Sequence, residues 1–349
     1  SSYRRILDQL KPREFLGLTA TPERGDGIDV REFFDGRTAA EVRLWDALEE
    51  DLLTPFHYFG IADGVDITNV GWRNGAYDVA GLTDLYTGND ARSRVVLQAI
   101  RDKISDPGSM RALGFCVSID HARYMARVFN DAGLPAVAVD SREGSYDRDK
   151  ALRELAAGDI TTVFTVDMFN EGIDVPAVDT VLFLRPTESP TIFLQQLGRG
   201  LRIAPDKPVC TVLDFVGNQR VEFRFDRRFQ AITGATRQAL EKQVEKGFPF
   251  LPGGTQIVLD RQSQAAVLAN LRAQVVSTTR QMVAELRAHP TEELAKFLNE
   301  AGVELSDVVR SDRSWTKIRR EAGVAIAPTG PNETALLKRI RAFAHVDDP

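Results

Sequence analysis

The chain has 349 residues, of which 43% are hydrophobic and 27% charged, and this composition is typical of a globular protein with about two domains. Its formal net charge of −6 argues against general polyanion binding, so contacts with nucleic acid would need local basic patches. The two cysteines, Cys116 and Cys210, lie in apolar runs, which predicts buried free thiols in a reducing compartment and excludes a disulfide framework or a zinc site. No apolar run approaches the roughly 18 residues of a membrane span and no signal peptide is visible, so we expect a cytoplasmic protein without membrane contacts.

Short apolar runs rich in β-branched and aromatic residues predict strands that are buried on both faces, because the runs are continuous rather than alternating. The first run stands alone at 15–19, and five more follow at 112–118, 136–139, 162–166, 181–184 and 209–215. Helical patterns at 119–132, 145–157 and 190–202 separate these later runs. Repetition of strand, helix and strand predicts an α/β fold with a parallel sheet and flanking helices.

The pattern divides the chain into four segments. Residues 1–45 are expected to be the end of one α/β domain, 46–90 a connection between lobes, and 91–218 a complete parallel-sheet domain. Residues 219–349 read as a mainly helical accessory domain, with helical patterns at 233–245, 263–287, 291–301, 312–321 and 332–345. The run R-F-D-R-R-F at 224–229 alternates ring and charge, which suggests an edge strand or a hinge.

The helical pattern at 190–202 separates apolar from polar residues. A start signal comes from Ser189 and Pro190, a capping hydroxyl followed by a first-turn proline. The core-facing stripe consists of Phe193, Leu197 and Leu201, and the roughly opposite face carries Gln195, Arg199 and Arg202. Gly198 and Gly200 each cost a helix about 1 kcal/mol relative to alanine, so we expect them to have a use; Gly198 would let another surface approach. Two neighbouring guanidinium groups suit the charge on a transferring phosphoryl group, and the alternative is a solvated basic face.

Four motifs follow predicted strands in a fixed order. They are T-A-T-P at 19–22, F-C-V-S at 115–118, Thr165 with E-G-I-D at 171–174, and Q-Q-L-G-R-G-L-R at 195–202. In this order the chain resembles the superfamily II helicases and translocases over about residues 1–218, with these motifs matching the family's third to sixth. The resemblance implies RecA-like folds: residues 1–45 would end the first motor domain and 91–218 would form the second.

The resemblance also implies a role for each matched residue. Arg202 would be the arginine finger, with Arg199 beside it on the nucleotide phosphates and Gln195 positioning both. Nucleotide-edge positions would be Gly172, Asp174 and Gly198, and coupling between nucleotide and nucleic acid would run through Thr19 and Thr21. Contacts with strand phosphates would come from Ser118, Thr165 and Ser141. Without their neighbours, Thr19 and Thr21 would read as an ordinary turn and Asp174 as a loop acid.

The family's phosphate-binding loop G-x-x-x-x-G-K-[ST] and its Mg²⁺-binding acidic pair do not occur in the sequence. In the family both precede T-A-T-P, so we expect ATP and Mg²⁺ to be bound mainly by an upstream part of the same polypeptide. This chain alone is then expected not to hydrolyse ATP.

Two segments after the motor, at 248–261 and 313–323, resemble a tail of a bacterial subgroup of these helicases. Trp315 lies among cations that could bind a single strand by stacking and charge: Arg310, Arg313, Lys317, Arg319 and Arg320. The alternative, which we favour, is that Trp315 packs into the accessory core.

We therefore expect the C-terminal part of an ATP-dependent DNA helicase or translocase, with single-stranded or duplex DNA as partner and RNA left open. The alternative is a non-catalytic nucleic-acid-binding or assembly module that keeps the fold. A third possibility is a nuclease-linked or restriction-type translocase in DNA repair or phage defence. Any nuclease would lie elsewhere, because the four histidines His57, His121, His289 and His345 are scattered and predict no metal site.

Overall fold

A computed structural model gives the structure of the chain. It describes residues 14–19, 34, 36–73, 75–140, 146–167, 175–187, 189–220, 222–235, 237–249, 251–273, 279–288, 290–301, 303, 305–309, 313–324, 326, 330–333 and 336.

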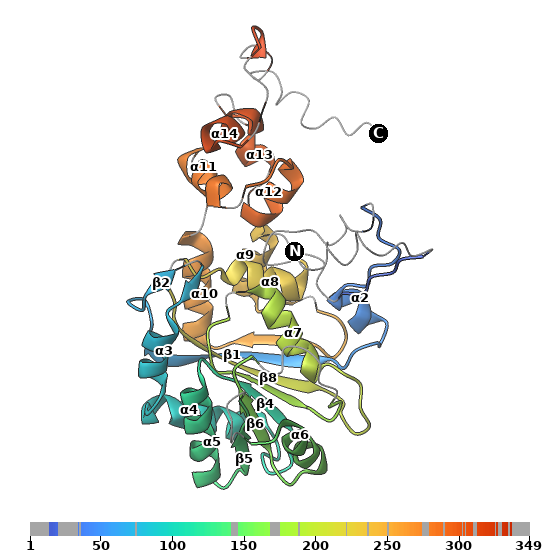
Figure 1. Cartoon of the computed structure of the whole chain (residues 1–349), viewed down its shortest axis with the longest axis vertical. Helices are drawn as coiled ribbons and strands as arrows, with labels where there is room; N and C mark the ends of the chain where they lie inside the picture. Colours follow the sequence, from blue (N-terminus) through green and yellow to red (C-terminus); the bar gives the residue numbers. More distant parts are fainter. Residues whose placement is uncertain are drawn as a thin grey trace.

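A seven-stranded parallel sheet organises the larger part of the molecule (Figure 1). Its strand order is β5-β6-β4-β7-β8-β1-β9. The strands are β1 (Phe56–Asp66), β4 (Ala112–Phe115), β5 (Ala136–Ala138), β6 (Thr162–Thr165), β7 (Thr180–Phe183), β8 (Cys210–Asn218) and β9 (Gln256–Leu259). A separate antiparallel pair consists of β2 (Trp72–Arg73) and β3 (Ala76–Tyr77). The predicted fold class is confirmed.

Helices cover both faces of the sheet. One core contains apolar side chains of α4 (Asp90–Lys103) and α5 (Ile119–Asp131), packed against residues such as Leu182 and Leu213. The opposite core contains those of α6 (Arg148–Ala157), α7 (Pro190–Gly200) and α8 (Phe225–Thr233), with Val181 and Phe183. Since neighbouring residues of β7 enter different cores, the strand is buried on both faces, as its continuous apolar run predicts.

The sheet extends beyond the predicted domain boundaries at 91 and 218. Residues 56–66, expected within a connection between lobes, form β1, which pairs with β8 from Phe56 opposite Cys210 onward. Strand β9, inside the expected helical region, pairs with the other side of β1. The sequence of β1 contains Gly60 and Gly64 and lacks a continuous apolar run, so the criterion that found the other strands missed it.

At the N-terminal end, residues 15–19 form no strand and are exposed. A strand needs a hydrogen-bonded neighbour, and the described part of the chain places none beside this segment. Further along lie the short helix α2 (Leu44–Glu49) and helix α3 (Val79–Tyr86). The expectation of a strand at 15–19 is therefore wrong for this chain by itself.

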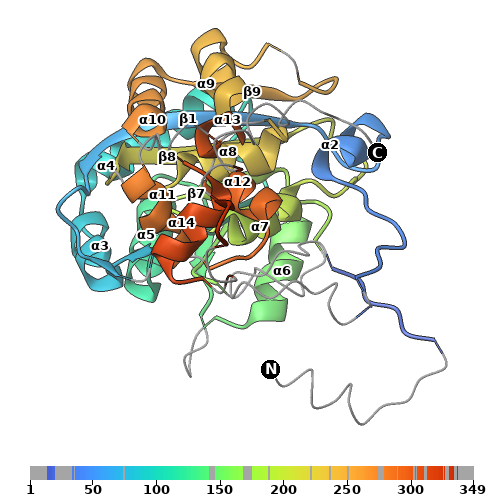
Figure 2. The ribbon, with the colours of Figure 1, turned by 90° about the horizontal axis from the view of Figure 1, so that it is seen from above.

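The accessory region contains α8 to α14 in the described residues. The run at 224–229 is neither an edge strand nor a hinge, because it begins helix α8. Helices α9 (Arg237–Lys246) and α10 (Arg261–Ala273) pack with α8 against the sheet. The remaining four are α11 (Thr279–Ala288), α12 (Leu294–Ala301), α13 (Leu305–Val308) and α14 (Trp315–Ala322). They share a small apolar core of their own and cluster together in both views (Figures 1 and 2).

Candidate nucleotide and nucleic-acid site

Helix α7 begins where the sequence indicates but ends at Gly200, two residues before the predicted end, so Arg202 lies just after it. The Ser189 hydroxyl accepts a hydrogen bond from the Ile192 amide at 3.4 Å, and Pro190 is the first helical residue. The stripe formed by Phe193, Leu197 and Leu201 is buried, and Gln195, Arg199 and Arg202 are partly exposed. The neighbouring Gln196, which no motif singled out, is fully buried. The arginines are thus neither sealed in the core nor fully solvated.

The two glycines of α7 differ in their surroundings. A Cβ atom on Gly200 would lie 2.4 Å from the Cys210 sulfur and 2.9 Å from Val181 Cγ2. This close approach of α7 to β7 and β8 requires glycine, because real Cβ atoms do not come so near other atoms. A Cβ atom on Gly198 would meet nothing within 4 Å. Gly200 therefore serves packing, and Gly198 leaves open space beside Arg199.

Helix α7 runs from the carboxyl ends of the strands of the sheet toward their amino ends. Near its start, the Phe193 ring stacks on that of Phe183, the last residue of β7, at 4.7 Å. At its end, Gly200 lies against Cys210, the first residue of β8. The helix has 11 residues and spans about 16 Å at 1.5 Å per residue. Arg199 and Arg202 consequently lie toward the amino-terminal edge of these strands.

The residues predicted to contact nucleic acid follow the carboxyl ends of β4 and β6. Ser118 caps α5, its hydroxyl accepting from the His121 amide at 3.2 Å, and it is partly buried. Thr165 is fully buried in this structure, and its hydroxyl has no hydrogen-bond partner among the described residues. A strand phosphate does not reach Thr165 without movement of its surroundings. Its predicted role, like that of Ser118, stays a prediction.

Several predicted site residues have no described placement. Thr21, Ser141, Gly172 and Asp174 lie outside the described residues, and Thr19, which is described, is exposed. The structure consequently brings together Gln195, Gly198 and Arg199 on α7, with Arg202 just after its end.

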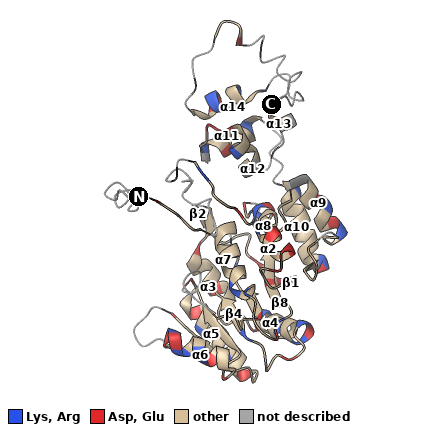
Figure 3. Cartoon of the chain, turned by 90° about the vertical axis from the view of Figure 1, so that its right-hand side faces the viewer, with Lys and Arg blue, Asp and Glu red and all other residues tan. Residues whose placement is uncertain are grey.

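Trp315 packs within the accessory helices. Its ring centroid lies 4.8 Å from that of Phe297, and its indole N–H donates to the Glu292 carbonyl at 3.4 Å. Two cations beside it are paired: Arg319 with Glu292 at 3.5 Å, and Arg320 with Glu333 at 2.9 Å. The predicted single-strand platform is at odds with this packing, and the alternative of a core tryptophan fits it. Basic residues lie beside acidic ones on α9 and α11 as well (Figure 3).

A buried cluster at the carboxyl ends of β1 and β7 escaped the sequence analysis. Arg92 of α4 is 2% exposed and donates to Asp63 at 2.8 Å and to the Leu184 carbonyl at 2.9 Å. Its guanidinium also lies 3.4 Å from His121 Nε2. Burial and the Arg92 charge hold the pKa of His121 well below its ordinary value. The sequence signal for this cluster was the helical spacing of Arg92. It precedes the buried Val96 by four residues and therefore lies on the apolar stripe of α4.

A second buried cluster lies beneath α7. Asp214 of β8 accepts hydrogen bonds from Arg228 of α8 and from the Tyr58 hydroxyl of β1. Burial raises the pKa of Tyr58 well above its ordinary value; the Asp214 charge also raises it, and the Arg228 charge opposes the rise. The sequence signal for this cluster was the carboxylate of Asp214 within the apolar run V-L-D-F. A charge in a buried strand needs a partner, so this residue predicts a buried cation or donor nearby.

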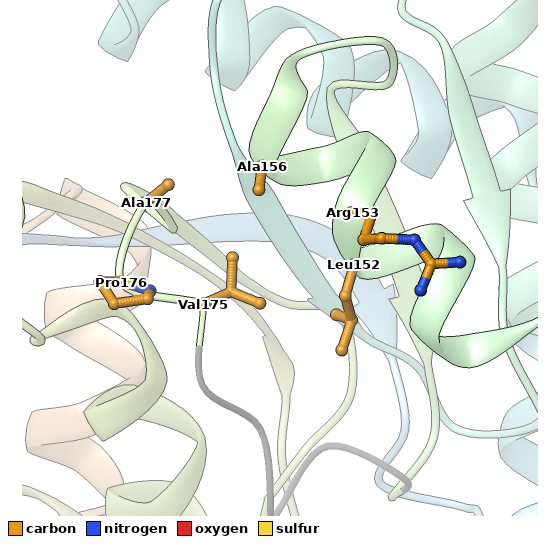
Figure 4. Close-up of a pocket in the computed structure, with 6 residues that line it drawn as sticks. All are labelled: Leu152, Arg153, Ala156, Val175, Pro176 and Ala177. Carbon is orange, nitrogen blue, oxygen red and sulfur yellow. The ribbon is translucent and has the colours of Figure 1, made fainter.

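A pocket of about 240 Å³ lies between α6 and the segment before β7 (Figure 4). It is lined by Leu152, Arg153, Ala156, Val175, Pro176 and Ala177. Apart from Arg153 these walls are aliphatic and carry no acid or base, so the pocket offers no catalytic group.

The described side chains suit part of a nucleotide site. Arg199 and Arg202 carry positive charge that fits phosphate groups.

No three described His, Cys, Asp or Glu residues lie close enough together to hold a metal ion. Among the described helices, none has both the length and the apolar character needed to cross a bilayer.

Comparison with known proteins identifies the domain that contains α7. The helicase conserved C-terminal domain family matches residues 95–204. These residues therefore match a helicase C-terminal domain, as the resemblance to superfamily II helicases predicts. The predicted resemblance is therefore confirmed for the part of the chain that carries the fourth to sixth motifs.

Two curated relatives and one solved structure extend this result. The chain is 26% identical over 227 residues to the "Putative ATP-dependent helicase IRC3" of Saccharomyces cerevisiae, covering 63% of this chain and 33% of that protein. It is 27% identical over 258 residues to the Type I restriction enzyme EcoAI endonuclease subunit of Escherichia coli, covering 66% and 31%. "The fragment structure of a putative HsdR subunit of a type I restriction enzyme from Vibrio vulnificus YJ016" matches with a TM-score of 0.52 and 21% identity, covering 74% and 46%, which shows a shared fold. The chain spans less than half the length of the curated relatives it matches.

Proposed function

We propose that this chain is the C-terminal part of an ATP-driven DNA helicase or translocase and supplies its arginine finger. The observation that carries the proposal is the partial exposure of Arg199, in the last turn of α7, and of Arg202, just after the helix ends, within a helicase C-terminal domain. The names of the helicase and restriction-enzyme relatives support an ATP-dependent motor acting on DNA. Their greater length supports a first motor lobe elsewhere in the polypeptide.

The proposed role of the arginines is electrostatic. The bound nucleotide, held with Mg²⁺ mainly by the first lobe, supplies the phosphoryl group that is transferred to water. The guanidinium groups of Arg199 and Arg202 carry positive charge, and the packed end of α7 positions both. Such a positioned guanidinium is worth about 10³–10⁵ in rate when it meets the charge of the transferring group. Gln195 lies one turn before Arg199 and would position it.

Helix α7 also offers a route between nucleotide and nucleic acid. Arg199 lies in its last turn and Arg202 just after it, and its start lies at the carboxyl edge of the sheet, the edge at which Ser118 follows β4. Contacts there would be made mainly to phosphates, so affinity should depend weakly on base sequence and fall with salt. We place the protein in the cytoplasm because its two cysteines are free and buried.

The test is DNA-stimulated ATP hydrolysis by the full-length protein carrying Arg202→Ala. We expect turnover to fall by about 10³-fold or more while DNA affinity changes little. The control is Arg101→Ala, which removes an exposed arginine from α4. Unchanged turnover in Arg202→Ala would remove the finger assignment.

The second candidate is a nucleic-acid-binding or assembly module without an engine. It is favoured by the absence of G-x-x-x-x-G-K-[ST] from the 349 residues. The gene sequence upstream distinguishes the two, because a phosphate-binding loop and an acidic pair there would support the motor. Under the motor proposal, we also expect that this chain by itself does not hydrolyse ATP.

A further inference from the structure

Three successive carbonyl groups at the end of α7 each accept a hydrogen bond from outside the helix. The Gly200 carbonyl accepts from Lys207 Nζ at 3.1 Å, and the Leu201 carbonyl accepts from the Thr54 amide at 2.8 Å. The Arg202 carbonyl accepts from the Thr54 hydroxyl at 3.1 Å. The last carbonyls of a helix have no partner within it, so tertiary contacts fix the backbone here.

Lys207 joins two motif-bearing segments. Besides Gly200, its ammonium donates to the carbonyls of Pro176 at 2.7 Å and Val178 at 3.0 Å. An ammonium has three N–H donors, and each one has a carbonyl acceptor here. The positive charge also lies at the carboxyl end of α7, where the helix dipole favours it. Lys207 therefore holds the chain that follows the fifth motif against the end of the sixth.

Thr54 is buried and is held at the start of β1. It is 4% exposed, and the carbonyl of the next residue, Pro55, accepts from the Cys210 amide at 2.8 Å. Phe56, the first residue of β1, pairs with Cys210 and is fully buried. The backbone of Arg202 is therefore held by a buried residue just before β1, whose neighbour Pro55 is hydrogen-bonded to β8.

We propose that Thr54 and Lys207 are positioning residues for the arginine finger. By fixing the carbonyl groups of residues 200–202, they set the direction of the Arg202 side chain just after the end of α7. This inference rests on the proposed function, because it assigns Arg202 to the phosphates. Neither residue needs to touch nucleotide, and each acts through the Arg202 backbone.

The expected signature is a lower kcat with an unchanged KM for ATP, because finger contacts develop in the transition state. In the full-length protein, Thr54→Val keeps the shape and the backbone amide of Thr54 and removes only the hydroxyl. We expect its kcat to fall about five- to thirtyfold, since small misplacements of a catalytic group cost up to about a hundredfold. Thr54→Ser restores the hydroxyl and should restore kcat to within about twofold. Lys207→Met removes three donors and should lower kcat at least as much.

Matched controls separate positioning from general damage. Thr255→Val removes a buried hydroxyl that has no partner among the described residues, and Lys242→Met removes an exposed ammonium from α9. Both should leave kcat unchanged. Where Lys207→Met does not fold, the comparison of Thr54→Val with Thr54→Ser decides by itself.

Arg202→Ala, measured in parallel, distinguishes the positioning role of Thr54 and Lys207 from the finger role of Arg202. If Arg202→Ala loses turnover and Thr54→Val matches the Thr255→Val control, the positioning role is overturned and the finger remains. If Arg202→Ala keeps full turnover, the proposed function fails instead. An increase in KM at constant kcat for Thr54→Val would also overturn the positioning role.

Discussion

The guanidinium carbon of Arg228 in α8 lies 4.1 Å from the centroid of the Phe193 ring in α7. The same side chain donates to Asp214 of β8, so the first accessory helix forms a buried charge pair with the sheet and lies over a ring of α7. Arg224, the residue just before α8, and Arg227 of α8 lie 3.4 and 3.3 Å from Glu285 of α11. A continuous set of contacts thus runs from α11 to α7, and the accessory region is packed onto the helix that precedes the proposed finger.

Removal of one partner from the buried pair should destabilise the fold strongly. Arg228→Met leaves Asp214 with the Tyr58 hydroxyl but without a counter-charge, and the free energy of unfolding should fall by about 3–5 kcal/mol. The double variant Arg228→Met with Asp214→Leu removes both charges and should recover part of this loss. Urea unfolding measures both, and a loss below about 1 kcal/mol in the single variant would contradict the assignment.

The glycines of α7 should respond oppositely to alanine. Gly200→Ala forces a Cβ atom against Cys210 and Val181, so unfolding should become easier by about 1–3 kcal/mol. Gly198→Ala meets open space and gains helix propensity, so it should stabilise the fold by up to about 1 kcal/mol. Thermal unfolding of the two variants provides the comparison. If Gly198 serves approach of the nucleotide-bearing lobe, Gly198→Ala should nevertheless lower ATP turnover in the full-length protein.

The two thiols should be inert in the folded protein. Burial raises the pKa of both Cys116 and Cys210 to about 12, so at pH 8 only about one thiol in 10⁴ is a thiolate. A thiol-specific reagent should label neither cysteine before unfolding and both after it. In the unfolded chain these thiols ionise near their ordinary pKa, so stability should fall as pH rises from about 9 toward 12. Rapid labelling of native protein at pH 8 would contradict their burial.

Trp315 should matter for folding of the accessory helices rather than for DNA binding. Trp315→Ala removes the contact with Phe297 and should cost about 2–4 kcal/mol within α11–α14, less than for a fully buried tryptophan. DNA affinity of the folded variant should remain within about twofold. Trp315→Phe keeps the ring contact and serves as control. A tenfold loss of DNA affinity in a folded Trp315→Ala variant would restore the stacking role.

The sequence by itself determined the α/β fold class, the start of α7 and the division of its faces. These features depend on local information: continuous apolar runs, the Ser-Pro start and residues spaced three or four apart. The motifs added the family, because four short patterns in order are specific where each alone is weak.

Only the tertiary structure decided which distant segments complete the domain and its site. Strands β1 and β9 lack continuous apolar runs, so their places in the sheet depend on pairing with β8 and with each other. The charged residues Arg92 and Arg228 are read as surface groups until their buried partners are known. Thr54 lies 148 residues from Arg202 in the chain, and no local pattern links them. Helix and strand formation is governed by neighbours in sequence, whereas the partner of a carbonyl or a buried charge is chosen by packing of the whole domain.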